Sequence, residues 1–173
     1  MKINPKIINK SILFLTGIPG AGKTELSKKL YENLKKNKVN AKNIDGDKFR
    51  KKITNQNYDD KSRELIGRLK IMEAIKYYDK GYFVIVSGVG YKKKWRNDLR
   101  RICKNINYKE IYLKCSMSEC IKRNFFLNKN KELLKKKSYK YEEYKNFDLM
   151  IDTESLSLYK SLKKILKLIN VSK

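Results

Sequence analysis

The 173-residue sequence contains no histidine, so the side chain that most often serves as a general base near neutral pH is missing. Any proton acceptor must therefore be a carboxylate or a lysine. The three cysteines, Cys103, Cys115 and Cys120, lack the C-x-x-C spacing of a metal or redox site, and we expect them to be reduced. The first ten residues are too charged for a signal peptide, and no apolar run approaches the about 18 residues of a membrane span. These absences predict a cytoplasmic protein without a membrane partner.

The sequence is also poor in acidic residues, since 18 Asp and Glu stand against 43 Lys and Arg, giving a formal net charge of +25. One interpretation is a surface that binds RNA or DNA. Another is a coding bias, because the chain is also rich in Asn and Ile, and a third is recognition of a small polyanion. Aromatic residues do not alternate with the lysine runs as a stacking surface for single strands requires, so we expect a small anionic partner and no nucleic acid.

A phosphate-binding motif is present near the N-terminus. Residues 17–24 fit G-x-x-x-x-G-K-[ST], with an apolar run at 12–16 before them and Leu26, Leu30 and Leu34 at helical spacing after them. We predict that this P-loop binds a nucleoside triphosphate through Gly17, Ile18, Pro19, Gly20, Ala21, Gly22, Lys23 and Thr24. Lys23 would reach the β- and γ-phosphate oxygens, and the hydroxyl of Thr24 would hold Mg²⁺.

Short apolar runs alternate with amphipathic segments along the chain, which is typical of an α/β protein. Strands are expected at 12–16, 41–44, 82–87, 108–113 and 147–151, and helices at 25–36, 49–53, 60–80, 92–104, 117–127 (beginning near Ser118) and 158–169. In the helix at 60–80, Leu65, Leu69, Met72 and Ile75 have the spacing of one face. We predict a single P-loop NTPase domain over residues 1–173, a three-layer αβα sandwich with a five-stranded, mainly parallel sheet. A lid is expected at about residues 124–146.

Acidic residues follow only one of the early strands. The apolar strand at 82–86 ends in Ser87-Gly88, whereas Asp45 and Asp47 follow the strand at 41–44. Because the carboxyl ends of parallel strands meet at one crevice, these two carboxylates should lie near the P-loop. Asp47 is predicted to contact Mg²⁺ and to accept a proton from an attacking hydroxyl. The alternative is an Asp-Gly turn in which Asp45 only caps the next helix.

The segment Asp45-Gly46-Asp47-Lys48-Phe49-Arg50 resembles the D-G-D-x-x-R motif of adenylylsulfate (APS) kinases. Segments at 58–68, 84–87, 112–124 and 141–153 resemble the same family in the same order. The resemblance implies that the γ-phosphoryl group of ATP is transferred, with Mg²⁺, to the ribose 3′-hydroxyl of an anionic nucleotide. It also implies a homodimer, because APS kinases are commonly dimers. The catalytic residues would be Asp47 and Lys23, the metal ligands Thr24 and Asp47, and the acceptor-side residues Asp45, Arg50, Tyr58, Arg63, Ile66 and Ser87.

Departures from the family pattern gather on the acceptor side. Ile66 stands where the family has a substrate-contacting Asn, residues 87–90 replace an I-S-P strand end, and the stretch between Arg123 and Tyr141 is shorter. An altered acceptor pocket beside an unaltered P-loop favours a different acceptor. Cytidine diphosphoramidate kinases resemble APS kinases and phosphorylate the 3′-hydroxyl of a pyrimidine nucleotide, and we favour that branch. APS kinase proper is the alternative, followed by an RNA-end kinase or RNA-binding P-loop protein.

Overall fold

The computed structural model describes residues 8–53, 59–126, 141–142 and 146–170. Its strands are β1 (Ile12–Thr16), β2 (Ala41–Ile44), β3 (Phe83–Gly88), β4 (Tyr108–Lys114) and β5 (Leu149–Asp152). Its helices are α1 (Lys23–Lys36), α2 (Gly46–Lys52), α3 (Asp60–Asp79), α4 (Lys93–Ile102), α5 (Met117–Phe126) and α7 (Leu158–Asn170). Within these ranges, no helix is long and apolar enough to cross a membrane.

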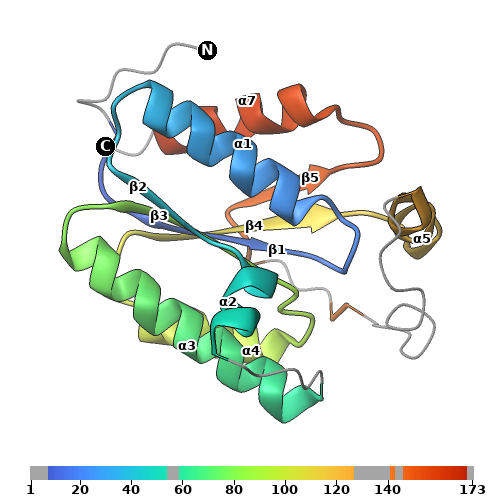
Figure 1. Ribbon diagram of the computed structural model, residues 1–173, viewed down its shortest axis with the longest axis horizontal. Helices are drawn as coiled ribbons and strands as arrows, with labels where there is room; N and C mark the ends of the chain where they lie inside the picture. The colour runs from blue at the N-terminus through green and yellow to red at the C-terminus, as the bar shows by residue number, and fades with distance from the viewer. Residues whose placement is uncertain (1–7, 54–58, 127–140, 143–145, 171–173) are drawn as a thin grey trace.

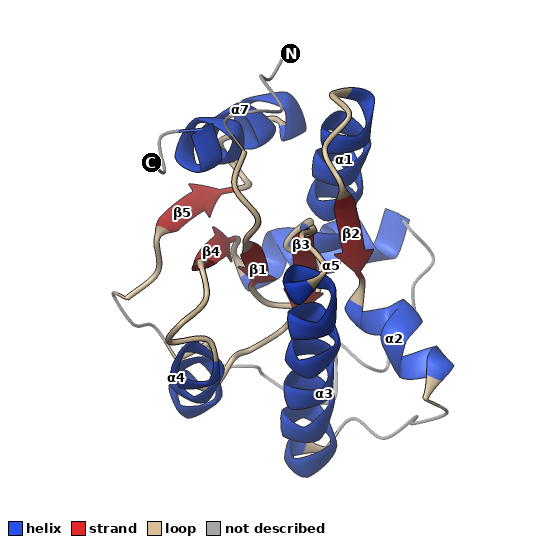
Figure 2. Ribbon diagram, turned by 90° about the vertical axis from the view of Figure 1, so that its left-hand side faces the viewer, coloured by secondary structure: helices blue, strands red, loops and turns tan. Residues whose placement is uncertain are grey.

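The five strands form one parallel sheet in the order β2-β3-β1-β4-β5. Helices α1 and α7 cover one face of the sheet, and α3 and α4 cover the other (Figure 1). The view turned by 90° shows the same three layers along the strands (Figure 2). The predicted αβα sandwich is confirmed, and the sheet is wholly parallel. All strand carboxyl ends therefore meet at one edge, where ligands bind in open α/β folds.

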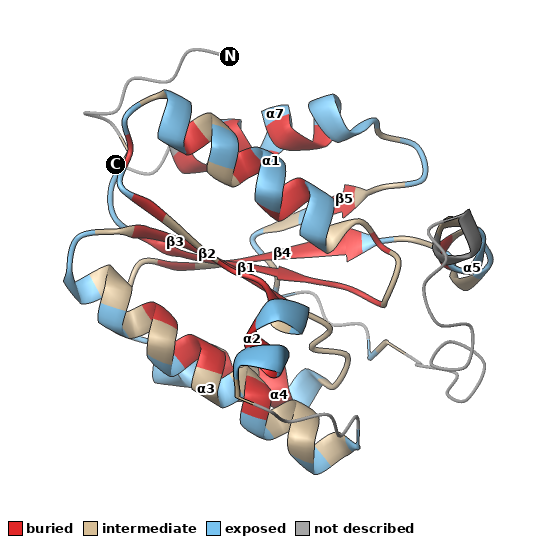
Figure 3. Cartoon of the chain, viewed as in Figure 1, coloured by how far each residue is buried: buried red, intermediate tan, exposed pale blue. Residues whose placement is uncertain are grey.

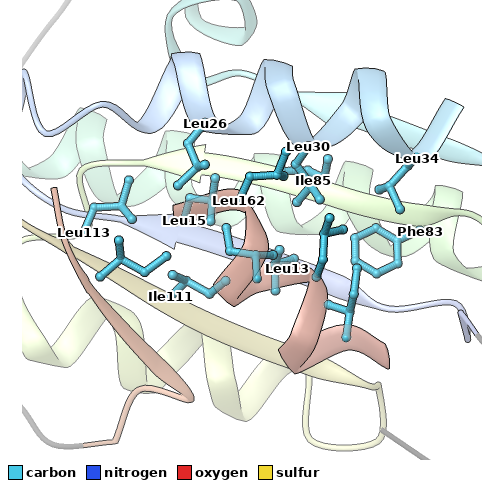
Figure 4. Packing of buried hydrophobic residues seen from close by; sticks show 14 of the residues in the cluster. Leu13, Leu15, Leu26, Leu30, Leu34, Phe83, Ile85, Ile111, Leu113 and Leu162 are labelled. Carbon is cyan, nitrogen blue, oxygen red and sulfur yellow. The ribbon is translucent and has the colours of Figure 1, made fainter. Parts of the chain in front are cut away.

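Each central strand supplies side chains to two separate cores, because successive residues of a strand point to opposite faces. On β1, Leu13 and Leu15 pack with α1 and α7, while Ile12 and Phe14 pack on the α3 side. The predicted leucine face of α1 meets the first of these cores (Figure 4). Burial is concentrated in the sheet and on the inner faces of the helices (Figure 3). The two cores hold the carboxyl ends of the strands in a rigid row.

The inner face of α3 matches the predicted one only in part, since Leu69 and Ile75 pack against the core on this side of the sheet. Leu65 and Met72 are 50% and 55% exposed, whereas the helix buries Ile66, Lys70 and Ile71. Apolar residues lie on several sides of this helix, so their spacing alone does not select the face that meets the sheet. The true face also contains a lysine, which a hydrophobic pattern does not include.

The ends of the other elements lie within two residues of their predicted places, except that α2 begins at Gly46, three residues before the predicted start. Helix α5 begins at Met117, the first residue of its predicted range, although Ser118 was expected to begin it. The side chain that satisfies its first turn is Ser116, whose Oγ accepts a hydrogen bond from the amide of Glu119 at 3.2 Å. Local capping sets the ends of a helix, whereas the spacing of apolar residues locates only its body. Differences of a few residues at the ends are therefore expected.

Candidate active site

The P-loop runs from the end of β1 to the start of α1 across the carboxyl edge of the sheet. Gly17 has φ +149°, and a Cβ on it would lie 2.6 Å from the carbonyl oxygen of Leu113 on β4. Gly22 is left-handed, with φ 86°, and immediately precedes Lys23, the first residue of α1. The loop therefore leads into the N-terminus of α1 at the carboxyl edge of the sheet, and a glycine loop that opens a helix in this way is an arrangement that binds phosphate groups.

Lys23 is held against the P-loop. Its Nζ donates hydrogen bonds to the carbonyl oxygens of Gly17 at 2.9 Å and Ile18 at 2.8 Å. Burial lowers the pKa of Lys23 to about 8, and Asp47 is the charge that most opposes this shift. The ammonium group therefore lies beside the loop and within electrostatic reach of a carboxylate, where it can neutralise the charge of phosphate oxygens.

Asp45 joins three elements through its two carboxylate oxygens. Oδ1 accepts hydrogen bonds from the amides of Asp47 at 3.1 Å and Lys48 at 3.2 Å, which caps α2. Oδ2 accepts from the hydroxyls of Thr24 at 3.0 Å and Ser87 at 3.2 Å. Burial acts to raise the pKa of Asp45, but these hydrogen bonds outweigh it and hold the pKa below its usual value. The capping alternative is therefore correct for Asp45, and the same side chain also contacts the P-loop threonine.

Asp47 lies in the first turn of α2, two residues after Asp45. Among the described residues, none donates a hydrogen bond to its carboxylate, while its charge acts on both Lys23 and Lys70. A carboxylate that is near two ammonium groups and not engaged by capping amides is available to a ligand. The structure therefore separates the two acids: Asp45 is bound into the framework, and Asp47 faces the crevice charges.

The two predicted arginines lie close to the same group of charges. Arg50 on α2 is 8% exposed, and its positive charge contributes to lowering the pKa of Lys70. Arg63 on α3 is half-buried, and its positive charge contributes to lowering the pKa of Lys23. Both guanidinium groups are therefore within electrostatic reach of the crevice, as expected for residues that hold an anionic ligand.

The remaining predicted acceptor-side residues are placed differently. Ser87 is buried at the end of β3 and supports Asp45 through its hydroxyl group. Ile66 is 3% exposed and packs in the apolar core on the α3 side, outside the group of polar side chains. Tyr58 and most of the predicted lid lie outside the described residues. Ile66 therefore lies in the core, away from the place where the predicted contact with the acceptor would be made.

The structure adds two side chains to the crevice, of which Lys70 was missed from the sequence. Lys70 of α3 is 4% exposed and donates a hydrogen bond to the carbonyl oxygen of Ser87 at 2.6 Å. Tyr141 contacts the hydroxyl of Thr16 at 3.3 Å, and its ring stacks on Tyr112 with centroids 4.4 Å apart. Nothing in the spacing of Lys70 distinguishes it from the surface lysines. Tyr141 thus contacts two strands, β4 through its stacked ring and β1, the strand before the P-loop, through its hydroxyl group.

A buried ion pair supports that wall of the crevice. Arg96 and Glu110 are both fully buried, with Nε and Oε1 3.5 Å apart. Arg96 also donates to the backbone carbonyl oxygens of Gly90 and Glu142, and its guanidinium lies 4.5 Å from the ring centroid of Tyr141. One side chain therefore holds the β3–α4 loop, β4 and the 141–142 segment together beside the P-loop.

The residues present fit Mg²⁺. In the described part of the chain, no three His, Cys, Asp or Glu residues form a ready-made metal cluster. Mg²⁺ does not need one, because it commonly binds through one or two carboxylates, phosphate oxygens and water. Thr24, Asp45 and Asp47 supply a hydroxyl and two carboxylates at the mouth of the P-loop. Thr24 and Asp47, the ligands predicted from the sequence, therefore lie close to Asp45 at the same end of the crevice.

A family model described as adenylylsulphate kinase matches residues 9–152. The chain is 36% identical over 124 residues to the cytidine diphosphoramidate kinase of Campylobacter jejuni subsp. jejuni serotype O:2, an alignment that covers 72% of this chain and 69% of that protein. It is 32% identical over 166 residues to a probable adenylyl-sulfate kinase of Aeropyrum pernix, with 87% of each chain covered.

The fold is also found among solved structures. The Mycobacterium tuberculosis APS kinase CysC, in complex with AMPPNP and APS, matches with a TM-score of 0.82 and 19% identity. The match covers 94% of this chain and 98% of that chain. At this level of identity the likeness establishes a shared α/β fold and nothing about the substrate.

Proposed function

The chain belongs to the adenylylsulphate kinase family of P-loop phosphotransferases, and we propose that it transfers the γ-phosphoryl group of ATP to the ribose 3′-hydroxyl of cytidine 5′-diphosphoramidate. The 36% identity to the Campylobacter jejuni cytidine diphosphoramidate kinase carries this choice of acceptor. The departures at residues 87–90 and in the shorter stretch between Arg123 and Tyr141, beside an unaltered P-loop, support it. The 32% identity to the Aeropyrum pernix protein favours APS as the second candidate acceptor.

The proposed reaction needs positioned charges more than covalent chemistry from the protein. Asp47 would accept the proton of the 3′-hydroxyl as the oxygen of that group attacks the γ-phosphorus. Lys23 and the P-loop amides would neutralise charge on the transferred group and on the departing β-phosphate. Arg50 and Arg63 would hold the anionic groups of the acceptor, since guanidinium groups suit phosphate oxygens.

Mg²⁺, when bound, would neutralise phosphate charge and help to align the donor. Thr24 and Asp47 would hold it with Asp45, whose carboxylate already accepts the hydrogen bond of the Thr24 hydroxyl. Asp45 would thereby link the metal side of the site to the carboxyl ends of β2 and β3. This role requires an ionised carboxylate, which the lowered pKa of Asp45 provides at neutral pH.

The test is a side-by-side assay of ADP release with MgATP and either cytidine diphosphoramidate or APS, followed by ³¹P NMR of the product. We expect a higher kcat/KM for cytidine diphosphoramidate and a new 3′-phosphomonoester signal. A higher kcat/KM for APS would show that APS, and not cytidine diphosphoramidate, is the acceptor. Absence of ADP release with both acceptors would contradict the proposed function.

The residue assignment is tested with Asp47→Asn. This variant should still bind ADP measured without Mg²⁺, but lose at least about 100-fold in kcat, because it removes the proton acceptor and a predicted Mg²⁺ ligand while keeping the side-chain volume. A fully active variant would contradict the role of Asp47. The RNA alternative, motivated by the charge of +25, predicts oligonucleotide binding that weakens steeply with salt. Fluorescence anisotropy with a labelled RNA, without binding at physiological ionic strength, would remove it.

A further inference from the structure

A second buried lysine lies at the carboxyl edge of the sheet, apart from the lysine of the P-loop. Lys70 projects from α3 to the end of β3, where its Nζ donates to the carbonyl oxygen of Ser87 at 2.6 Å. The residue is 4% exposed. An ammonium group has three donor hydrogens, and this hydrogen bond is its single one to the described residues.

Two glycines make room for the Lys70 ammonium group. A Cβ on Gly88, at the end of β3, would lie 2.6 Å from Nζ, and a Cβ on Gly46, at the start of α2, would lie 3.3 Å from it. Any larger residue at position 88 would therefore displace the ammonium group. Nζ lies at the junction of β2, β3 and α2, next to the turn that carries Asp45 and Asp47.

The charges around Lys70 do not include a direct partner of opposite sign. Among the described residues, no ion pair within 4.0 Å involves this lysine, and the carboxylates that act on it most are Asp45 and then Asp47. The like charges of Lys23 and Arg50 also reach it, and burial lowers its pKa to about 8. An unpaired buried ammonium group destabilises a fold, and an apolar side chain of similar length would fill this space without that cost.

The sheet order separates this lysine from the donor site. The P-loop follows β1 and crosses toward β4, as the approach of Gly17 to Leu113 shows. Lys70 lies on the opposite side of β1, at the ends of β3 and β2. The carboxylate of Asp45 stands between the two, with one oxygen on both Thr24 and Ser87. The β2–β3 side is thus left for the second substrate.

We propose that Lys70 is an acceptor-binding residue that attracts the anionic group of the acceptor nucleotide to the β2–β3 end of the crevice, beside Asp47. This inference rests on the proposed function, because it presupposes a nucleotide acceptor. A positive charge in a site with little water acts strongly on a nearby phosphate oxygen. The ammonium group thereby increases affinity for the acceptor and leaves the binding of the donor unchanged.

The test compares Lys70→Met with Lys76→Met, the same substitution at an exposed position of the same helix. Isothermal titration calorimetry measures binding of MgADP, and then of cytidine diphosphate or APS to the protein saturated with MgADP. These mixtures contain no phosphoryl donor, so affinity is measured without turnover. We expect Lys70→Met to bind the accepted probe at least about tenfold more weakly, with MgADP affinity unchanged, because a charge-assisted contact is lost. Lys76→Met should match the wild-type protein for both ligands.

Steady-state kinetics provide the second readout. Lys70→Met should raise the KM of the acceptor at least about tenfold and change the KM of ATP and kcat little. A fall in kcat at constant acceptor KM would assign Lys70 to support of Asp47, and unchanged acceptor affinity would remove any role; either result overturns the inference. If Lys70→Met does not fold, Gly88→Ala displaces Nζ while retaining the lysine and should weaken acceptor binding in the same selective way.

The outcome also distinguishes this inference from the function on which it rests. If the wild-type protein phosphorylates an acceptor and Lys70→Met binds that acceptor normally, the inference fails and the kinase function stands. If the wild-type protein binds and phosphorylates neither probe, the proposed function fails and the inference fails with it.

Discussion

Substitution of Asp45 should separate its contribution to stability from its contribution to activity. Its carboxylate accepts four hydrogen bonds: from the amides of Asp47 and Lys48, and from the hydroxyls of Thr24 and Ser87. Asp45→Ala removes a helix cap, which costs about 1 kcal/mol. It also leaves the buried Ser87 hydroxyl without this acceptor, which costs a further ~1–3 kcal/mol. The expected loss is therefore about 2–4 kcal/mol, or roughly 4–16 °C in Tm for a chain of this size.

Asp45→Asn should give a different result. Its amide oxygen can still cap α2, and its NH₂ group can donate to the two hydroxyl oxygens, so the expected cost in stability is below about 1 kcal/mol. The negative charge on the metal side of the site is lost, however, and we expect kcat/KM to fall about 100-fold, equivalent to ~2.7 kcal/mol of transition-state stabilisation.

The assays are thermal unfolding by circular dichroism and ADP release with the accepted nucleotide. Asp59→Asn is the matched control, because Asp59 caps α3 at the surface by accepting from the amide of Ser62 at 2.9 Å. Asp59→Asn should leave activity unchanged and should change stability by no more than about 1 kcal/mol. The reasoning is refuted if Asp45→Asn retains full activity, or if it loses as much stability as Asp45→Ala.

Three further predictions follow from buried groups. Arg96→Met should destabilise the protein by about 3 kcal/mol in urea unfolding, because it leaves the fully buried Glu110 with the half-buried Arg100 as its remaining ion-pair partner and removes the donor to the Gly90 and Glu142 carbonyl oxygens; an unchanged midpoint would contradict this. Gly17→Ala should weaken MgADP binding at least about tenfold by calorimetry, since its Cβ would lie 2.6 Å from the Leu113 carbonyl oxygen; normal affinity would show that the loop adapts. Burial lowers the pKa of Lys70 from 10.5 to about 8, so between pH 8 and pH 10.5 the unfolded chain binds more protons than the folded protein. The stability of the wild-type protein should therefore rise relative to that of Lys70→Met over this pH range. A pH-independent difference between the two proteins would contradict the lowered pKa.

The local pattern of the sequence was sufficient for the P-loop, the strand–helix alternation and the leucine face of α1, because each depends on neighbours along the chain. It failed for α3, where apolar residues on several sides made Leu65 and Met72 look buried although both are more than a third exposed. Which side of a helix meets a sheet depends on the packing of the whole layer, and spacing cannot supply it.

The sequence by itself therefore determined the class of protein, a P-loop phosphotransferase, through its glycine loop with Lys23 and Thr24, and it predicted a carboxylate as proton acceptor because the chain has no histidine. Tertiary structure decided how Asp45 and Asp47 differ in their surroundings. Only folding brings the Asp45 carboxylate to Thr24 and Ser87, which are 21 and 42 residues away. It also selected Lys70 among many lysines by burying it at the ends of β2 and β3. Residue type sets which bonds and charges are available, whereas the parallel sheet, by aligning its carboxyl ends, sets which of them meet.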